Sequence, residues 1–116
     1  MAHAAKYLYF AIMDVEPEKE ALLNEVYDTE HVPALLKVPG VRSITRCKAQ
    51  DFAMIMGGSR RDIKVGDNPA YMAIYEIDAP EVLTSPEWAA AVEIGRWPEH
   101  VRPYTKNRRQ VLRKVL

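Results

Sequence analysis

The sequence predicts an α+β fold in which strands and helices follow the order β-α-β-β-α-β. Three observations support this prediction. Aromatic and branched residues form short apolar runs at three places, residues 6–15, 41–48 and 70–78. After the first run and after the third, two stretches place apolar residues at helical spacing, and each begins at a proline, Pro17 or Pro86. Weak alternation of apolar and basic residues over 104–115 predicts the fourth strand.

Length and composition predict one globular domain, residues 1–116. Apolar residues make up 48% of the chain and charged residues 28%, which excludes a disordered chain. Sixteen basic residues balance sixteen acidic ones, so we expect neither nucleic acid nor a membrane surface as a partner. The basic stretch 106–114 is the exception, and it leaves a solvated or interface strand and an anion-binding patch as open alternatives.

The cysteine content predicts a cytoplasmic protein. Cys47 is the only cysteine, so no intrachain disulfide forms, and a reducing compartment is the simplest setting. Residues 1–20 lack the basic and long apolar regions of a signal peptide. No Cys/His spacing typical of a metal site occurs, and Gly57-Gly58-Ser59 lacks the lysine of a phosphate-binding loop. We therefore expect neither a metal nor a cofactor.

The first strand, residues 6–15, is followed by a helix with an internal proline. In the strand, Tyr7 and Tyr9 share one face, while Leu8 lies on the other. The helix is expected over 17–29. Pro33 lacks an amide hydrogen, so the helix must kink or restart there, giving a further segment 33–37.

The second strand is expected over 41–48, with a continuation through 52–56 left open. Turn signals over 57–62 and 65–69 then flank a polar connection of roughly ten residues, long enough for a lid or an interface arm.

The third strand is expected over 70–78, with Tyr71 and Tyr75 on one side. In the second helix Ser85 is the expected N-cap residue, and Gly95 is the expected stop.

This order of elements predicts a ferredoxin-like subunit whose two helices cover one face of an antiparallel sheet. We expect the other face, open to solvent in a single chain, to carry the tyrosine-rich set of side chains: Tyr7, Tyr9, Met13, Tyr71 and Tyr75. So much exposed apolar surface exceeds what monomers normally show, and a second copy of the chain is the simplest cover. The sequence thus predicts a homodimer.

Residues 27–33, YDTEHVP, followed by VPGV at 38–41 and preceded by a tyrosine-rich strand, resemble the dimeric α/β-barrel superfamily and, within it, the EthD-like proteins. The later blocks YMAIYEID and APEVLTSPEW are similar to that family's third strand and second helix. The resemblance implies that two open sheet faces pair into a barrel, with a cavity enclosed by each subunit's sheet. Related proteins include cofactor-independent cyclases, isomerases and quinone-forming monooxygenases, and also accessory proteins without a demonstrated reaction.

His31 is the candidate catalytic residue. Its unperturbed pKa lies near neutrality, so it can give or take a proton at physiological pH. Asp28 lies three residues earlier on the same helical face and is expected to orient the ring. The alternative is that both residues form a polar lock between helix and sheet.

The candidate substrate-binding residues form two groups. The first comprises the strand tyrosines Tyr7, Tyr9, Tyr71 and Tyr75, and the second comprises Trp97, His100 and Arg102. Apolar pockets with a few hydroxyls are typical of small-molecule sites. The alternatives are aromatic pairs that only stabilise the sheet, and a solvated loop. Residues 99–101, Glu-His-Val, repeat residues 30–32, which is weak evidence for an internal duplication.

Two functions follow from these residues. The first is a homodimeric protein that binds a small hydrophobic, aromatic or polyketide-like molecule and, as an enzyme, uses His31 for acid/base chemistry with tyrosines stabilising an enolate or phenolate. The second is a non-catalytic binding or assembly module that uses its sheet face only for dimerisation. An open cavity reached by His31 would favour the first, and a solidly filled interface between subunits would favour the second.

Overall fold

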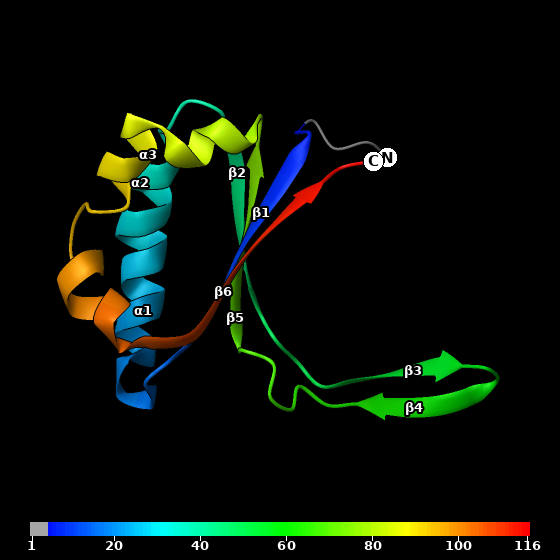
Figure 1. Cartoon of the computed structure of the whole chain (residues 1–116). Helices are drawn as coiled ribbons and strands as arrows, with labels where there is room; N and C mark the ends of the chain where they lie inside the picture. The colour runs from blue at the N-terminus through cyan, green and yellow to red at the C-terminus, as the bar shows by residue number, and fades with distance from the viewer. Residues whose placement is uncertain (1–4) are drawn as a thin grey trace.

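The computed structural model describes residues 5–116 and contains a four-stranded antiparallel sheet with the order β2-β5-β1-β6 (Figure 1). Its strands are β1 (Tyr7–Val15), β2 (Val41–Lys48), β5 (Tyr71–Ile77) and β6 (Thr105–Lys114). In this order β1 is a central strand and pairs with the edge strand β6. The helical segments that connect the strands all lie on one side of the sheet. The predicted ferredoxin-like α+β fold is confirmed.

The first helical segment passes Pro33 without a break. It comprises the 3₁₀ turn η1 (Pro17–Lys19), α1 (Glu20–Val26), the π-helical turn η2 (Tyr27–His31) and α2 (Val32–Leu36). The Val32 amide donates to the Tyr27 carbonyl, five residues back. This wider turn accommodates a residue that has no amide hydrogen, so the expected kink takes the form of one π turn. Such turns are frequent at functional sites.

The second helical segment begins with η3 (Pro80–Thr84) and α3 (Pro86–Ala91). Ser85 caps α3 as predicted, because its Oγ accepts a hydrogen bond from the Trp88 amide at 3.1 Å. Gly95, with φ of +72°, follows α3 and leads into a second π-helical turn, η4 (Trp97–Val101), and then η5 (Arg102–Tyr104). The helical layer therefore contains two π turns, one in each half.

A separate hairpin projects from the body of the molecule. It consists of β3 (Phe52–Met56) and β4 (Ser59–Ile63), which pair only with each other, and we call residues 52–63 the arm (Figure 1). Gly57 and Gly58 form its turn with φ of +59° and +83°, as a two-residue hairpin loop requires. Residues 52–56 therefore form a strand of their own and do not continue the second strand. The predicted turn is confirmed at Gly57-Gly58, whereas residues 59–62 belong to β4.

The tyrosine-rich face of the sheet is covered by the helices, contrary to our expectation for the open face. Tyr9 pairs with Tyr75, and both pack on the helix-side core, where Tyr75 is 2% exposed. The open face carries the alternate set of side chains: Leu8, Phe10, Ile12, Met72 and Ile74. The alternation of side chains along each strand correctly predicted which residues share a face of the sheet. It did not decide which set faces the helices, because both are apolar.

The core lies between the sheet and the helical layer. Its largest fully buried side chains come from α1, α2, β5 and η4: Leu23, Val26, Leu35, Tyr75, Ile77 and Val101. Within residues 5–116, no helix is long and apolar enough to cross a membrane.

Candidate functional site

A cavity of about 190 Å³ lies between the helical layer and the sheet, and we call it the His31 cavity. Five aromatic side chains from β1, η2, β5, α3 and η4 line it: Tyr9, Tyr27, Tyr75, Trp88 and Trp97. Three basic side chains also line it: His31, Arg102 and Arg108. The cavity is therefore aromatic, with a few polar groups, as in small-molecule sites.

His31 is buried with one ring nitrogen unused. The residue is only 5% exposed, and its Nδ1 atom has no hydrogen-bond partner. The imidazole stacks on Trp97, with ring centroids 4.3 Å apart, and meets Tyr27 edge-on at 4.9 Å. The π turn places His31 four residues after Tyr27, so both side chains point from one face of the helix into the cavity.

Burial lowers the pKa of His31 to about 4, because the charged imidazolium would lose its hydration. The positive charges of Arg102 and Arg108 lower this pKa further, while Glu93 opposes them. The imidazole is consequently neutral at pH 7. A neutral ring can accept a hydrogen bond or a proton at one nitrogen and donate from the other.

Two phenol groups meet deeper in the structure. The hydroxyls of Tyr27 and Tyr75 lie 3.0 Å apart and share a hydrogen bond. Burial raises the pKa of Tyr27 to about 12, and burial also raises the pKa values of Tyr75 and Tyr9. All three phenols therefore stay protonated at neutral pH and can serve as hydrogen-bond donors.

The two arginines of the cavity differ in their partners. Arg102 forms an ion pair with Glu93 and donates to the Val92 carbonyl at 2.8 Å, so its charge is locally neutralised. Arg108 is exposed at the rim and forms no ion pair with any of residues 5–116.

Asp28 does not orient His31. Its carboxylate is exposed and accepts a hydrogen bond from Arg46 at 3.0 Å. Arg46 in turn lies over the Tyr27 ring, 4.7 Å from its centroid, and bonds Asn24. The expected Asp28–His31 pair is therefore not formed, because the π turn directs Asp28 toward β2 and His31 toward the cavity.

The structure brings together four of the seven predicted binding residues, namely Tyr9, Tyr75, Trp97 and Arg102. Tyr7 packs against the core but does not line the cavity. The Tyr71 hydroxyl bonds Glu20, near the start of α1. His100 is exposed on η4.

Sequence reasoning missed three aromatic or charged residues of the cavity, Tyr27, Trp88 and Arg108. Tyr27 precedes His31 by one helical turn, so the helix face that carries His31 was a usable signal. Trp88 was read only as part of the second helix. Arg108 lies within the basic stretch 106–114, where nothing in the sequence distinguishes it from its neighbours.

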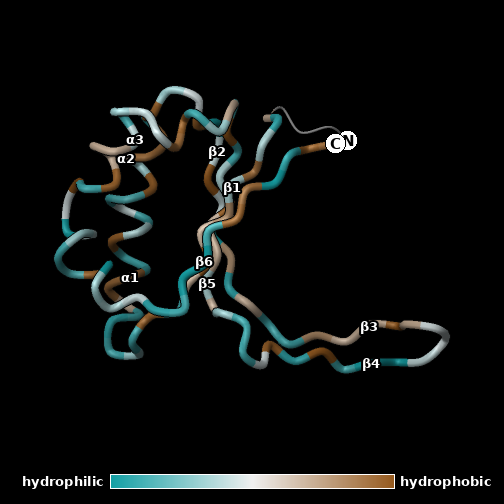
Figure 2. The backbone as a smooth tube through the Cα atoms, in the orientation of Figure 1, coloured by the Kyte–Doolittle hydropathy of each residue, from teal (hydrophilic) through white to brown (hydrophobic). Residues whose placement is uncertain are grey.

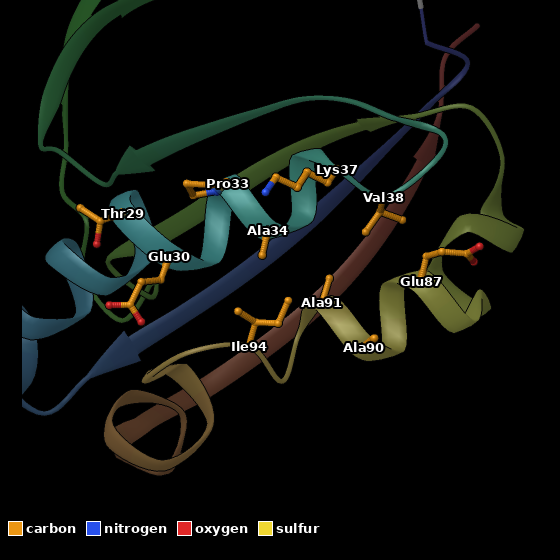
Figure 3. A pocket seen from close by; sticks show the side chains of 10 residues that line it. All are labelled: Thr29, Glu30, Pro33, Ala34, Lys37, Val38, Glu87, Ala90, Ala91 and Ile94. Carbon is orange, nitrogen blue, oxygen red and sulfur yellow. The ribbon is translucent and has the colours of Figure 1, made fainter.

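A larger groove of about 530 Å³ lies between α2 and α3 (Figure 3). Its walls are mostly apolar, including Pro33, Ala34 and Ile94. Its acid Glu30 already accepts hydrogen bonds from the Arg96 amide at 2.8 Å and from Arg96 Nε at 2.6 Å. We place the site at the smaller cavity because, among residues 5–116, the buried polar side-chain atom without a hydrogen-bond partner belongs to His31, which lines that cavity.

Within residues 5–116, no three His, Cys, Asp or Glu side chains gather in a way that could hold a metal ion. Cys47 is a free thiol on β2, partly buried. Neither feature adds a group to the His31 cavity.

No protein-family model matches the chain, and no curated protein matches it by sequence. Solved structures do match. The chain is similar to the haem degrader MhuD from Mycobacterium tuberculosis, whose structure holds two haems in its active site, at 11% identity and a TM-score of 0.60, covering 95% of each chain. A variant of MhuD with two manganese protoporphyrin IX molecules per active site matches with a TM-score of 0.63, at 11% identity, covering 95% of this chain and 94% of that one.

An EthD family protein from Bacillus halodurans matches at 16% identity and a TM-score of 0.58, covering 95% of this chain and 99% of that one. The chain therefore has a ferredoxin-like fold that it shares with these solved structures, one of which is an EthD family protein. At these identities the likeness establishes the fold and nothing finer.

Proposed function

We propose that this protein binds a small hydrophobic molecule, aromatic or polyketide-like, in the His31 cavity, and that His31 acts there as an acid/base group. One observation carries the proposal. A histidine that is 5% exposed keeps an unpartnered Nδ1 beside a cavity lined by aromatic rings. Unpaired buried polar groups are rare, and a ligand that hydrogen-bonds the imidazole from the cavity would account for one here.

The surrounding groups suit proton-transfer chemistry. His31 is neutral at pH 7, and a ligand oxygen or acidic C–H group beside it would meet a base or hydrogen-bond partner in a site with little water. Protonated phenols such as Tyr9 can stabilise an enolate or phenolate oxygen by donating a hydrogen bond. Asp28 has no part in this proposal, because it is bonded to Arg46.

We also propose that two copies of the chain pair through their open sheet faces. Phe10 and Ile74 lie side by side on that face, which no helix covers. The arm extends on the same open side and exposes Phe52, Met54 and Met56, which are 54%, 44% and 49% exposed (Figures 1 and 2). A second copy seated on the open face would cover both surfaces.

Light scattering tests the dimer. We expect twice the mass of one chain, and we expect Ile74→Lys to yield single chains. A native protein that runs as a monomer would contradict the dimer and leave the His31 cavity, which lies within one subunit, unaffected. A cytoplasmic location remains part of the proposal, on the ground of the single Cys47.

Haem, which one of the MhuD structures holds, does not fit the His31 cavity. At about 190 Å³ the cavity is below the 300–1,000 Å³ typical of sites for drug-sized ligands, and a porphyrin is larger still. We therefore derive no step through haem.

The alternative function is a non-catalytic assembly module, in which His31 serves only as a polar contact in the core. Fluorescence separates the two functions, because Trp88 and Trp97 are the only tryptophans of the chain and both line the cavity. We expect saturable quenching by one- and two-ring aromatic compounds, about tenfold weaker affinity in His31→Val, and no change in His100→Val. Absence of saturable binding for every compound would favour the assembly module.

A further inference from the structure

The rim of the His31 cavity carries one uncompensated positive charge. Arg102 is paired with Glu93, whereas Arg108 forms no ion pair with any residue from 5 to 116. With the imidazole of His31 neutral, the cavity therefore has a net charge near +1. Exposed arginines without partners are common on protein surfaces. Arg108 differs from them in its position at the cavity and in the bulge that fixes this position.

A β-bulge positions Arg108 at the cavity. Ile12 pairs with Arg109 and Asp14 with Lys106, so Met13 alone faces two residues of β6, Asn107 and Arg108. The bulge is held by Asn107, which adopts a φ of +53° and donates from Nδ2 to Asp14 Oδ2 at 2.8 Å. Bulges of this kind often redirect a side chain beside an active site.

The other oxygen of Asp14 is also in use. Asp14 Oδ1 accepts a hydrogen bond from the Ala70 amide at 2.8 Å, so the residue just before β5 and Asn107 of β6 both hold this carboxylate. These bonds hold the pKa of Asp14 below its usual range, which keeps it charged and acceptor-only at pH 7. Both oxygens of Asp14 are thus committed to hydrogen bonds with the Asn107 side chain and the Ala70 amide.

We propose that Arg108 is the anion-binding residue of the His31 cavity, and that the ligand is a small aromatic or conjugated molecule with an acidic oxygen. This inference rests on the proposed function. The planar guanidinium matches a carboxylate, an ionised phenol or an enolate, while the rings of Tyr9 and Trp97 contact the ligand's flat body. The positive charge at the rim favours anions over neutral and cationic analogues.

The electrostatics of the cavity agree with this geometry. The charge of Arg108 acts to lower the pKa values of three groups of the site. It opposes the effect of burial at Tyr9 and Tyr27, and it adds to the effect of burial at His31. Negative charge developing on a ligand beside these groups would be stabilised in the same way.

The test compares matched acids and amides. The probes are benzoate and 2-naphthoate, each paired with its primary amide, and calorimetric titration at pH 7.5 measures their affinities. We expect the affinity of each acid to be at least about tenfold higher than that of its amide. Arg108→Gln should abolish this preference, Arg108→Lys should retain part of it, and Arg109→Gln should leave it unchanged, because Arg109 shares the open face with Ile12. Light scattering on both glutamine variants checks that assembly is unaltered.

The outcomes separate this inference from the proposed function. Equal affinity for acid and amide, or a preference that survives Arg108→Gln, would overturn the role of Arg108 and leave ligand binding intact. Saturable binding of neither probe class at millimolar concentration would overturn both. An acid preference that Arg109→Gln also removes would assign the effect to the general charge of β6 and would overturn the role of Arg108.

Discussion

The two π turns of the helical layer bury different residues at equivalent positions. In both η2 and η4 the first and last residues are buried, Tyr27 and His31 in one, Trp97 and Val101 in the other. The repeated Glu-His-Val sequence is offset by one position, so that His100 is the last but one residue of its turn and is exposed. Position in the turn, and not residue type, decides burial.

This comparison isolates what is unusual about His31. Valine fills the last position of η4 without any polar atom to satisfy. Histidine at the last position of η2 leaves Nδ1 unpaired, at a cost of about 1–3 kcal/mol in the free energy of unfolding. We propose that contact with a ligand is the reason this destabilising group is kept, and the following predictions test the difference between the two turns.

The largest effect is expected from His31→Val, which makes the first turn resemble the second. Ligand affinity should fall about tenfold and any turnover should be lost, because the ligand loses its imidazole partner. The free energy of unfolding at pH 7.5 should stay within about 1 kcal/mol of the native value, since removal of the unpaired nitrogen offsets lost stacking on Trp97. Fluorescence titration and urea unfolding measure these effects, and undiminished affinity would remove His31 from the site.

A second effect is expected beside the contact that joins the two turns, in which Arg96, just before η4, donates hydrogen bonds to Glu30 of η2. Gly95 adopts a φ of +72°, and a Cβ atom there would collide with the Glu30 carboxylate. Gly95→Ala should lower the free energy of unfolding by about 3 kcal/mol, from backbone strain plus the displaced Glu30–Arg96 contact. Gly58→Ala is the matched control, because its φ is +83° with nothing within 4 Å, and it should cost about 1 kcal/mol. Equal losses in urea unfolding would show that Glu30 is irrelevant.

The pH dependence of the free energy of unfolding should differ between the native protein and His31→Val, in which both turns end in valine. Because the folded pKa of His31 is about 4, below its ordinary value of 6.5, the unfolded chain binds more protons between these values. The contribution of neutral His31 is complete above pH 6.5 and is lost as the pH falls toward 4. From pH 7.5 to 5 the native protein should lose about 2 kcal/mol more than His31→Val does. Urea unfolding at both values measures this, and parallel losses would contradict a buried neutral imidazole.

The smallest effect concerns the first residue of η2. Tyr75→Phe removes the partner of the Tyr27 hydroxyl and should cost about 1 kcal/mol in the free energy of unfolding. Tyr9→Phe is the control, because no hydrogen bond to its hydroxyl occurs within residues 5–116, and it should be nearly neutral. Thermal unfolding compares the two variants, and equal costs would mean that the Tyr27–Tyr75 bond contributes nothing measurable.

The sequence was sufficient to predict the order of elements in the four-stranded sheet and its helical layer, because each signal is local. Alternation marks β1 and β5, and Ser85 with Pro86 marks the start of α3. The face of the sheet that meets the helices could not be predicted, since Tyr9 and Phe10 belong to sets that are equally apolar. The arm was missed as a hairpin, because its strand 59–63 is polar.

The site was predictable in its centre and not at its rim. His31, Tyr9 and Trp97 were candidates, and the structure brings them together. Asp28 was misplaced, because helical spacing assumes regular turns and the π turn rotates it away. Arg108 depends on a bulge that no local pattern marks.

The most direct test of the account is nitrogen NMR of the His31 ring with and without an aromatic ligand. We expect a neutral imidazole from pH 7 down to about 5, with a resonance of its unpaired Nδ1 that shifts when 2-naphthoate is added. A ring that titrates near pH 6.5 and whose resonances ignore every ligand would contradict both its burial and its role in binding.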